Sequence, residues 1–244
     1  ALLRPWVVCV LSLVGLHCWL AGIARLPDRL RGIKSFVLRQ GRLTPGQTRA
    51  LKVHWPKFGR AISDGMLHPG QQFSNAGPLH LEIGFGMGDS LAEQARLNPS
   101  VNYVGIEVHR PGVGHILMLI DEYELNNLRV YSEDSIDVLR EVIPVKSLDA
   151  VQVFFPDPWP KKKHHKRRIL NRDFVDLIET KLRANGLVHI ATDWQPYAEE
   201  IESLFGSMMQ FNRVAAPLRP QTKFERRGVK LGHTIFDLAY RLVD

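Results

Sequence analysis

The chain has 244 residues, enough to bury one large core, and a single α/β domain is the expectation. Its only two cysteines, Cys9 and Cys18, lie near the N-terminal end, which excludes a disulfide framework or a cysteine-based metal site in the rest of the chain. The formal net charge of +7 is unevenly distributed. Residues 25–60 hold ten Lys and Arg against one acid, and residues 161–172 hold seven and no acid. Two such patches are the electrostatic footprint of a protein that binds a phosphate backbone.

In chain order, the sequence predicts a basic N-terminal arm over residues 25–75 and a catalytic domain over 76–244. Residues 44–46 (Thr-Pro-Gly) are expected to form a loop within the arm. Beyond the arm, short apolar runs alternate with helical stretches, which predicts a mostly parallel sheet with helices on both faces. Strands are expected at 79–83, 102–107, 128–131, 149–155, 187–192, 210–214 and 234–242, and helices near 89–97, 113–125, 135–141, 171–183 and 195–206.

The first strand leads into a glycine-rich loop, residues 84–88 (Gly-Phe-Gly-Met-Gly). Glycines at alternate positions let the backbone turn sharply and leave room for a ligand against the main chain. Asp89 stands where the dinucleotide fingerprint needs its third glycine, which disfavours a nicotinamide-dependent oxidoreductase. Glu82, just before the first glycine, instead suits the ammonium group of an amino acid. This combination is similar to the first motif of S-adenosylmethionine-dependent methyltransferases.

The next two strands also end in an acid. Glu107 follows Gly86 by 21 residues, at the end of the second strand, where a Rossmann-type sheet presents a carboxylate to ribose hydroxyls. The third strand, 128–131, is followed by Glu133 and Asp134, which are placed to reach an adenine and which spacing alone barely separates. Three strands that each end in an acid are a stronger signal than one glycine loop.

The strand 149–155 leads into a carboxylate held between prolines, Asp157. Open α/β sheets place their ligands just past the C-terminal ends of the strands, and the prolines restrict the backbone on both sides of the acid. Residues 161–168 (Lys-Lys-Lys-His-His-Lys-Arg-Arg) then add six cations and two histidines. A single basic run is often only solvated surface, but two of them beside a cofactor-type sheet favour chemistry on a nucleic acid.

Together these motifs resemble one family, the bacterial tRNA (guanine-N7)-methyltransferases. The resemblance spans roughly residues 30 to 244 and is carried by residues 82–88, 105–109, 155–168, 192–194 and 222–225. It implies a Rossmann-like class I S-adenosylmethionine-dependent methyltransferase fold, with a seven-stranded, mostly parallel sheet whose last strand is antiparallel. It also implies that a methyl group is transferred from S-adenosyl-L-methionine to N7 of a guanosine in tRNA, guanosine 46 of the variable loop, in the cytoplasm.

The resemblance gives each motif a role. The cofactor would contact the glycine loop and the acids after the strands, namely Glu82, Gly84, Gly86, Gly88, Glu107, Asp134 and Asp157. The guanosine would meet Lys161, Asp193, Thr222, Lys223, Phe224 and Glu225. RNA would contact Lys163, His164, His165, Lys166, Arg167 and Arg168. No metal is expected, because adjacent histidines without nearby acids or thiols bind metal weakly. Two plainer interpretations stay open: Asp193-Trp194 as a cap of the following helix, and residues 222–225 as an ordinary loop.

Asp157 is the candidate catalytic residue. Guanine N7 carries an exposed lone pair, so in-line attack on a sulfonium methyl needs alignment and exclusion of water rather than a strong base. Because the product ring is cationic, a fixed carboxylate nearby stabilises the growing charge. We therefore expect Asp157 to position the guanosine and stabilise charge, while Phe154, Phe155 or Trp159 stacks on the exposed base.

Other functions stay open at this point. One is a methyltransferase that acts on DNA, on another RNA or on a protein glutamine, which would not explain the cation run after Asp157. Another is a non-catalytic RNA-binding protein on the same fold, which the intact acids Glu82, Glu107 and Asp157 disfavour. tRNA is the expected partner, and no protein partner is needed.

Residues 5–23 form an apolar stretch that, taken alone, is a candidate signal sequence or membrane anchor. A secreted tRNA-modifying enzyme would not meet its substrate or its cofactor. We therefore interpret residues 1–24 as an upstream extension, and membrane association is expected only if residues 5–23 are a real anchor.

Overall fold

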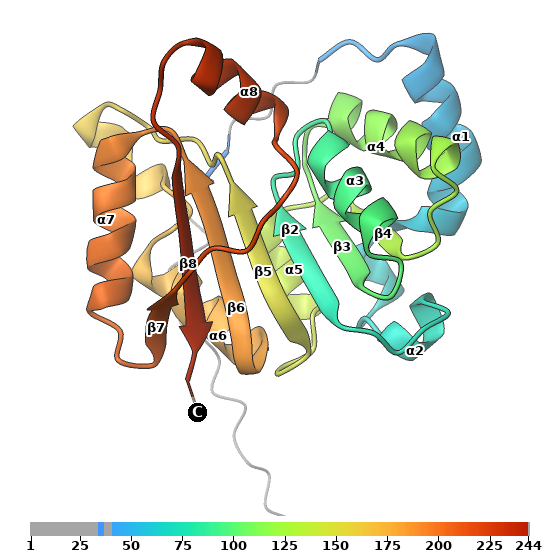
Figure 1. The fold of residues 1–244 in the computed structure, drawn as a ribbon. Helices are drawn as coiled ribbons and strands as arrows, with labels where there is room; N and C mark the ends of the chain where they lie inside the picture. The colour runs from blue at the N-terminus through green and yellow to red at the C-terminus, as the bar shows by residue number, and fades with distance from the viewer. Residues whose placement is uncertain (1–33, 37–40, 244) are drawn as a thin grey trace, which may run out of the picture.

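The computed structural model describes residues 34–36 and 41–243 (Figure 1). The expected N-terminal extension, its apolar stretch and both cysteines lie outside these residues. Within the described part of the chain, no helix combines the length and the apolar character needed to cross a membrane.

The fold is built on one eight-stranded sheet with the strand order β1-β4-β3-β2-β5-β6-β8-β7. β8 runs antiparallel to β6 and β7, and the other pairs are parallel. The strands are β1 (Gly59–Arg60), β2 (Leu79–Ile83), β3 (Asn102–Ile106), β4 (Leu128–Tyr131), β5 (Leu148–Phe154), β6 (Leu182–Thr192), β7 (Phe211–Val214) and β8 (Phe236–Leu242). The predicted α/β class and mostly parallel sheet are confirmed.

The sheet has one strand more than the seven that were expected. The additional strand is β1, which pairs with β4 through Gly59 and Arg60 only. Two residues are too few to show the alternating pattern by which a strand is found in a sequence. β6 also begins five residues before the expected 187, because Leu182 already pairs with Leu148 and a register shift follows.

The larger helices are α1 (Pro45–Phe58), α3 (Asp89–Leu97), α4 (Arg110–Glu122), α5 (Ser135–Glu141), α6 (Arg172–Lys181), α7 (Gln195–Gly206) and α8 (Lys223–Lys230). Shorter helical turns are η2 (Ile62–Asp64), α2 (Pro69–Gln72) and η3 (Lys162–Arg167). Helices 89–97, 135–141 and 195–206 have their predicted bounds. α1 and α8 were not predicted.

Both missed helices begin with a capping box. The Thr44 side chain accepts from the backbone N–H of Gln47, and the Gln47 side chain accepts from the backbone N–H of Thr44. Thr222 and Glu225 make the same reciprocal pair at the start of α8. The expected loop at 44–46 is therefore wrong, since a threonine cap followed by proline starts a helix.

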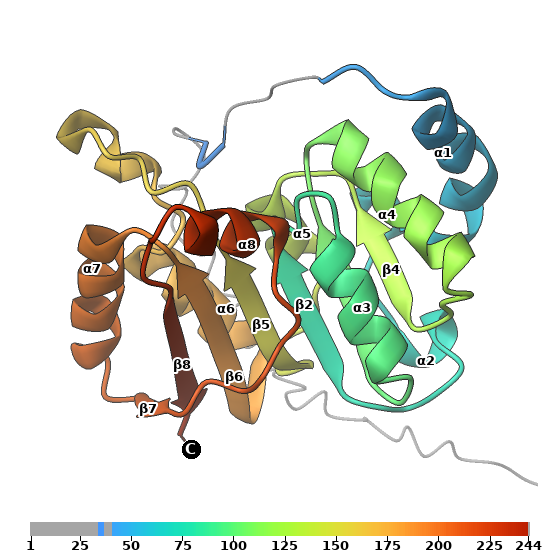
Figure 2. The ribbon, with the colours of Figure 1, turned by 45° about the horizontal axis from the view of Figure 1, so that its top comes forward.

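Helices cover both faces of the sheet (Figures 1 and 2). α3 and α4 lie on one face and contribute to one apolar cluster, which α1 joins. α5, α6 and α7 contribute to the other. α1 approaches α4 closely at Gly114, where a Cβ would lie 2.8 Å from Gln47 Cβ. The core is therefore closed on both sides, and the loops after the parallel strands gather at one edge of the sheet.

Candidate active site

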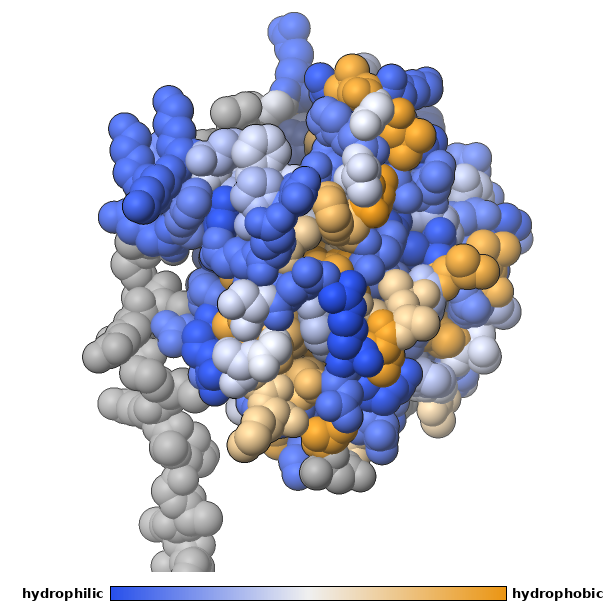
Figure 3. All heavy atoms as spheres, turned by 60° about the vertical axis from the view of Figure 1, so that its left-hand side comes forward, coloured by the Kyte–Doolittle hydropathy of each residue, from blue (hydrophilic) through white to orange (hydrophobic). Residues whose placement is uncertain are grey.

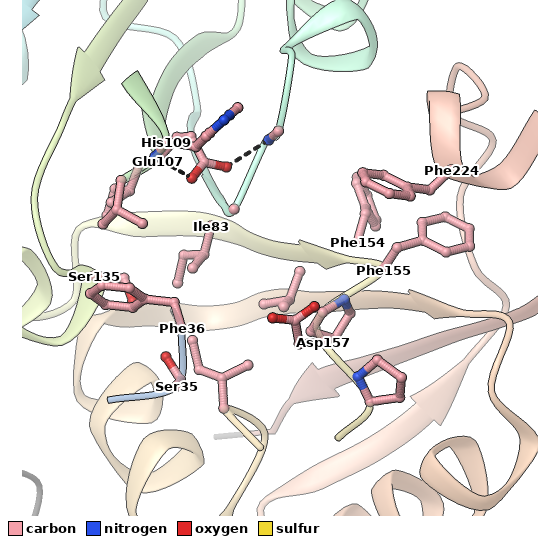
Figure 4. Close-up of a pocket in the computed structure, with 18 of the residues that line it drawn as sticks. Ser35, Phe36, Ile83, Glu107, His109, Ser135, Phe154, Phe155, Asp157 and Phe224 are labelled. Atoms are coloured by element: carbon pink, nitrogen blue, oxygen red, sulfur yellow. Dashed lines mark hydrogen bonds between the residues drawn. The ribbon is translucent and has the colours of Figure 1, made fainter. Parts of the chain in front are cut away.

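A cavity of about 580 Å³ lies at the carboxyl ends of β2, β3 and β5 (Figure 4). It is lined by the last residues of these strands, the glycine loop, the loop after β5, Phe224 of α8, and Ser35 and Phe36 of the arm. Its volume falls within the range of about 300–1,000 Å³ that is usual for small-molecule and cofactor sites. The cavity is therefore large enough to hold a ligand at the edge where the sequence predicted one.

The glycine loop adopts the backbone that the sequence predicted. Gly84, Gly86 and Gly88 have φ values of 74°, 61° and 84°, in the left-handed region that glycine adopts without strain. A Cβ built on Gly84 would meet nothing within 4 Å, and one on Gly86 would meet only Phe224 at 3.8 Å. The loop thus presents open main chain to the cavity, with the aromatic ring of Phe224 facing it.

Glu107 lines the cavity and fixes the glycine loop to the end of β3. Its Oε2 accepts from the backbone N–H of Gly86 at 2.8 Å, and its Oε1 accepts from that of His109 at 2.9 Å (Figure 4). Burial raises the pKa of Glu107, while hydrogen bonds from the backbone oppose that rise. Its carboxylate is therefore held in a fixed orientation beside the cavity.

Glu82 is buried next to the cavity and does not line it. Its side chain is buried on β2, and its Oε2 accepts from the Gln94 side chain at 3.2 Å. Gln94 in turn accepts from Gln152 of β5 at 2.9 Å. Burial raises the pKa of Glu82 to about 8, although the nearby Arg219 cation lowers it. The next residue, Ile83, lines the cavity, but Glu82 itself does not.

The two acids after β4 have separate positions. Glu133 lines the cavity, and its carboxylate accepts from the backbone N–H of Ile62 at 2.7 Å. Asp134 caps α5 by accepting from the backbone N–H of Ile136 at 3.0 Å, and it lines an adjoining hollow. The resemblance implied Asp134 as the cofactor contact, although spacing barely separated it from Glu133. In the structure the neighbours of Asp134, Glu133 and Ser135, line the main cavity.

Asp157 lines the cavity, and its carboxylate points into it (Figure 4). The loop that carries it is held in an uncommon backbone shape, with φ of 51° at Phe155 and 45° at Trp159. Non-glycine residues adopt such angles only where the surroundings impose them. Here the Trp159 indole donates to the carbonyl of Ser35 at 3.3 Å, and Arg168 Nε donates to the carbonyl of Pro158 at 2.8 Å.

The basic run forms the short helix η3 beside the cavity. The lysines at 161–163 and 166 are exposed, and Figure 3 shows hydrophilic side chains projecting from this side of the molecule. The Arg167 guanidinium lies 5.1 Å from the centre of the Trp159 ring, and His164 meets the same ring edge-on at 5.8 Å. Trp159 therefore connects the cation run with the loop of Asp157.

Arg168 differs from the rest of the run because it is buried, so the structure does not support the contact with RNA that was expected of it. Its side chain is 2% exposed, forms an ion pair with Glu200 and lies over the ring of Tyr197. The Arg168 guanidinium contacts Glu200, the Tyr197 ring and the carbonyl of Pro158. Arg168 therefore stabilises the loop that carries Asp157. The neighbouring lysines and Arg167 are the cations that the surface presents.

Most of the expected guanosine-binding residues do not line the cavity. Of these, Phe224 lines it. Thr222 caps α8, and the buried Glu225 carboxylate forms an ion pair with Arg219 at 2.6 Å. Asp193 lies 2.9 Å from His233 and does not cap α7, whose N-cap is Trp194.

Several residues at or beside the cavity were missed from the sequence, Ser135 among them. Ser35, Phe36 and His109 line it, and Arg219 lies against Phe154 and Phe155. Ser35 and Phe36 come from the arm, more than a hundred residues before the loop that Ser35 contacts, so no local pattern marks them. No sequence pattern marks Arg219 as a site residue. Its position, three residues before the cap of α8, gains meaning only once the structure is known.

The sequence matches known proteins over most of its length. Residues 76–238 match a family model described as "Putative methyltransferase". The tRNA (guanine-N(7)-)-methyltransferase of Alcanivorax borkumensis is 49% identical over 86% of this chain and 92% of its own length. The enzymes of that name from Alkalilimnicola ehrlichii and Pseudomonas aeruginosa are 49% and 45% identical, covering 86% and 88% of this chain and 93% and 91% of their own.

Solved structures agree on the fold. The 16S rRNA methyltransferase KamB matches with a TM-score of 0.52 at 12% identity, over 87% of this chain and 99% of its own. The aminoglycoside resistance methyltransferase NpmB1 matches with a TM-score of 0.50 at 14% identity, over 71% and 91%. These likenesses show a methyltransferase fold. Given the sequence identities and the extent of the match, the chain belongs to the tRNA (guanine-N(7)-)-methyltransferase family.

Proposed function

We propose that this chain transfers a methyl group from S-adenosyl-L-methionine to N7 of a guanosine in tRNA, inside the cavity between Glu107 and Asp157. The observation that carries the proposal is the convergence of two acids and an open glycine loop on one cavity, with the exposed lysines of η3 following the loop that carries Asp157. Membership of the family supports the choice of tRNA and of guanine N7.

The residues around the cavity fit a cofactor that has an amino acid at one end and a ribose at the other. Glu107 would hold the ribose hydroxyls, as acids at this place in Rossmann-type sheets do. Glu82, beneath the glycine loop, would balance the charge of the ammonium group. The open main chain at Gly84 and Gly86 leaves room for the ligand between them. When bound, the cofactor supplies an electrophilic methyl group on a sulfonium.

With the cofactor bound, guanine N7 would attack that methyl in line with its lone pair, and no proton would have to be removed first. The bond between N7 and the methyl carbon would replace the carbon–sulfur bond, whose electron pair would stay on sulfur. Positive charge would thus move from sulfur to the purine. The Asp157 carboxylate, which points into the cavity, stabilises the purine as this charge grows. Its role is to position and to stabilise, rather than to act as a general base.

Aromatic side chains provide the surface on which the base is aligned. Phe224 stands opposite the glycine loop, and Phe154 and Phe155 line the neighbouring wall. Bases removed from a stack bind to such rings at about 1–3 kcal/mol for each stacked base. We propose that the target guanine leaves its stack in folded tRNA and lies among these rings, with N7 toward the methyl.

Incubation with labelled S-adenosylmethionine and bulk tRNA, followed by nucleoside analysis, tests the proposal. The expected product is N7-methylguanosine, and mapping of tRNA fragments should place it at guanosine 46 of the variable loop. Label in another nucleoside would leave a methyltransferase with a different target. Absence of transfer to any RNA would favour the alternative, a non-catalytic RNA-binding protein. Activity on tRNA would also support a cytoplasmic location, where substrate and cofactor occur together.

A further inference from the structure

Arg219 lies at the junction of three segments that are far apart in the sequence. Its Nη1 donates to the Glu225 carboxylate of α8 at 2.6 Å. Its Nε and Nη2 donate to the Asp237 carboxylate of β8 at 3.1 and 2.8 Å. Its guanidinium lies 4.7 Å from the centre of the Phe154 ring, at the end of β5. The Arg219 side chain is 5% exposed, so this is a buried cation shared by three elements.

Its acidic partners are themselves held in place. Asp237 also contacts the ring of His189 on β6 at 2.8 Å. Burial acts to raise the pKa of Asp237, but hydrogen bonds from His189 and Arg219 outweigh it and hold the pKa below its usual value. Glu225 completes the capping box with Thr222. The ionised pair therefore connects the fixed sheet with the first turn of α8.

A further contact joins the segment before α8 to the first turn of α3, which follows the glycine loop. The Ser90 hydroxyl, in the first turn of α3, donates to the carbonyl of Pro220 at 3.1 Å. α8 lies over the carboxyl ends of β5 and β2 (Figure 2), and Phe224 is the residue of α8 that lines the cavity. Phe224 is 61% exposed, so packing alone does little to fix its position.

We propose that Arg219 is a positioning residue: it holds the first turn of α8 on the sheet and so places Phe224 opposite the glycine loop at the guanosine side of the cavity. This inference rests on the proposed function. Arg219 does not line the cavity, and it acts through Glu225 and the turn that Glu225 caps. The five N–H groups of a planar guanidinium let it serve two carboxylates at once, which a lysine ammonium cannot reproduce in the same geometry.

Anchoring of α8 can be distinguished from the general stability of the fold. Loss of Arg219 should loosen α8 and misplace Phe224 while leaving the rest of the sheet intact. Because Arg219 acts through Phe224, removing the ring should matter much less once Arg219 is gone. Two residues that contact each other, or act through one element, show such non-additivity, whereas independent residues do not.

The experiment compares Arg219→Ala, Arg219→Lys, Phe224→Ala and the double variant Arg219→Ala/Phe224→Ala. Arg213→Ala is the matched control, since Arg213 is an exposed arginine of β7 that is paired with Glu202. Hydrogen exchange of the amides of residues 222–230 is measured without ligands, and kcat and KM are measured with tRNA. If Arg219→Ala does not fold, Glu225→Gln takes its place, because it breaks the α8 side of the pair and leaves Arg219 with Asp237.

In Arg219→Ala we expect exchange over 222–230 to be at least tenfold faster, with β2 and β5 unchanged. kcat/KM should fall at least a hundredfold, with KM for tRNA rising, and Arg219→Lys should recover part of the loss. Phe224→Ala should lower kcat/KM in the parent but by less than threefold in the Arg219→Ala background. The Arg213→Ala control should behave as the parent does.

Unchanged exchange over 222–230, or an equal effect of Phe224→Ala in both backgrounds, would overturn the inference. The exchange measurement uses no substrate, so it tests Arg219 even if the parent does not methylate tRNA. In that case the proposed function fails, and the exchange result still decides whether Arg219 anchors α8.

Discussion

Glu107 and Gly86 are joined by a hydrogen bond of 2.8 Å from the Gly86 backbone N–H to the Glu107 carboxylate, across 21 residues of sequence. The bond fixes the glycine loop after β2 to the end of β3. The other carboxylate oxygen of Glu107 accepts from the His109 N–H, so both oxygens are already oriented before any ligand binds. A preoriented acceptor loses little entropy on binding, which suits a residue that holds ribose hydroxyls.

Glu107→Ala should therefore weaken S-adenosylmethionine binding by about 1.5–3 kcal/mol, the usual cost of losing hydrogen bonds to a charged group. Binding of tRNA should change little, because the role proposed for Glu107 is contact with the cofactor and not with the RNA. Isothermal calorimetry measures the first quantity and a fluorescence titration the second. Glu122→Ala, at the exposed end of α4, serves as the control. An unchanged cofactor affinity would remove Glu107 from the site.

Glu82 should make cofactor binding depend on pH. Burial raises its pKa to about 8, with Arg219 lowering and Glu107 raising it further by their charges. The folded, ligand-free protein therefore favours the protonated acid, and this contribution to stability is full below the ordinary pKa and lost as pH rises toward 8. A ligand with an ammonium group needs the ionised carboxylate. Cofactor affinity should thus rise by roughly tenfold per pH unit up to about pH 8.

Calorimetry at pH 7 in buffers of different ionisation enthalpy would detect this as the release of a proton on binding. Glu82→Gln should bind the cofactor more weakly and without proton release, since it cannot ionise. A parent protein that releases no proton and binds equally well at pH 6 and pH 8 would contradict the role given to Glu82. Stability of the ligand-free parent should decline over the same pH range.

Much of this site could be predicted from the sequence because its signals are local. The glycine loop and Glu107 follow strands with clear apolar patterns, and Asp157 is marked by its prolines. The rest depends on contacts between distant segments. Arg168 looks like its neighbours in the sequence, yet the structure buries it against Glu200. β1 is too short for any pattern, and it is recognised only by its pairing with β4.

The exposed lysines and the half-buried Arg167 of η3 should govern the salt dependence of tRNA binding. Replacing Lys163, Lys166 and Arg167 by alanine should weaken binding about equally for different tRNA sequences, since contacts to phosphates position an RNA without specifying its bases. Each lost phosphate contact should reduce the slope of log affinity against log salt by roughly one. Arg168 is kept, because its ion pair with Glu200 supports the loop.

The control replaces Lys146 and Arg183, which lie at the opposite end of the sheet, where β5 and β6 begin. For each charge removed, this control variant should change the slope of log tRNA affinity against log salt much less than the triple variant does, and should leave the slope nearly unchanged. If the triple variant keeps the slope of the parent, the run is only solvated surface. The RNA footprint would then have to lie on the basic arm at residues 25–60.

The rate of a single turnover by Asp157→Ala tests the central claim most directly, since the claim is that methyl transfer takes place in the cavity into which Asp157 points. The measurement uses saturating tRNA and S-adenosylmethionine, after equilibrium binding of both has been confirmed. The account predicts that both ligands still bind while the rate falls by about a hundredfold or more, the usual effect of removing an electrostatic stabiliser of the transition state. A rate near that of the parent under these conditions would contradict the account.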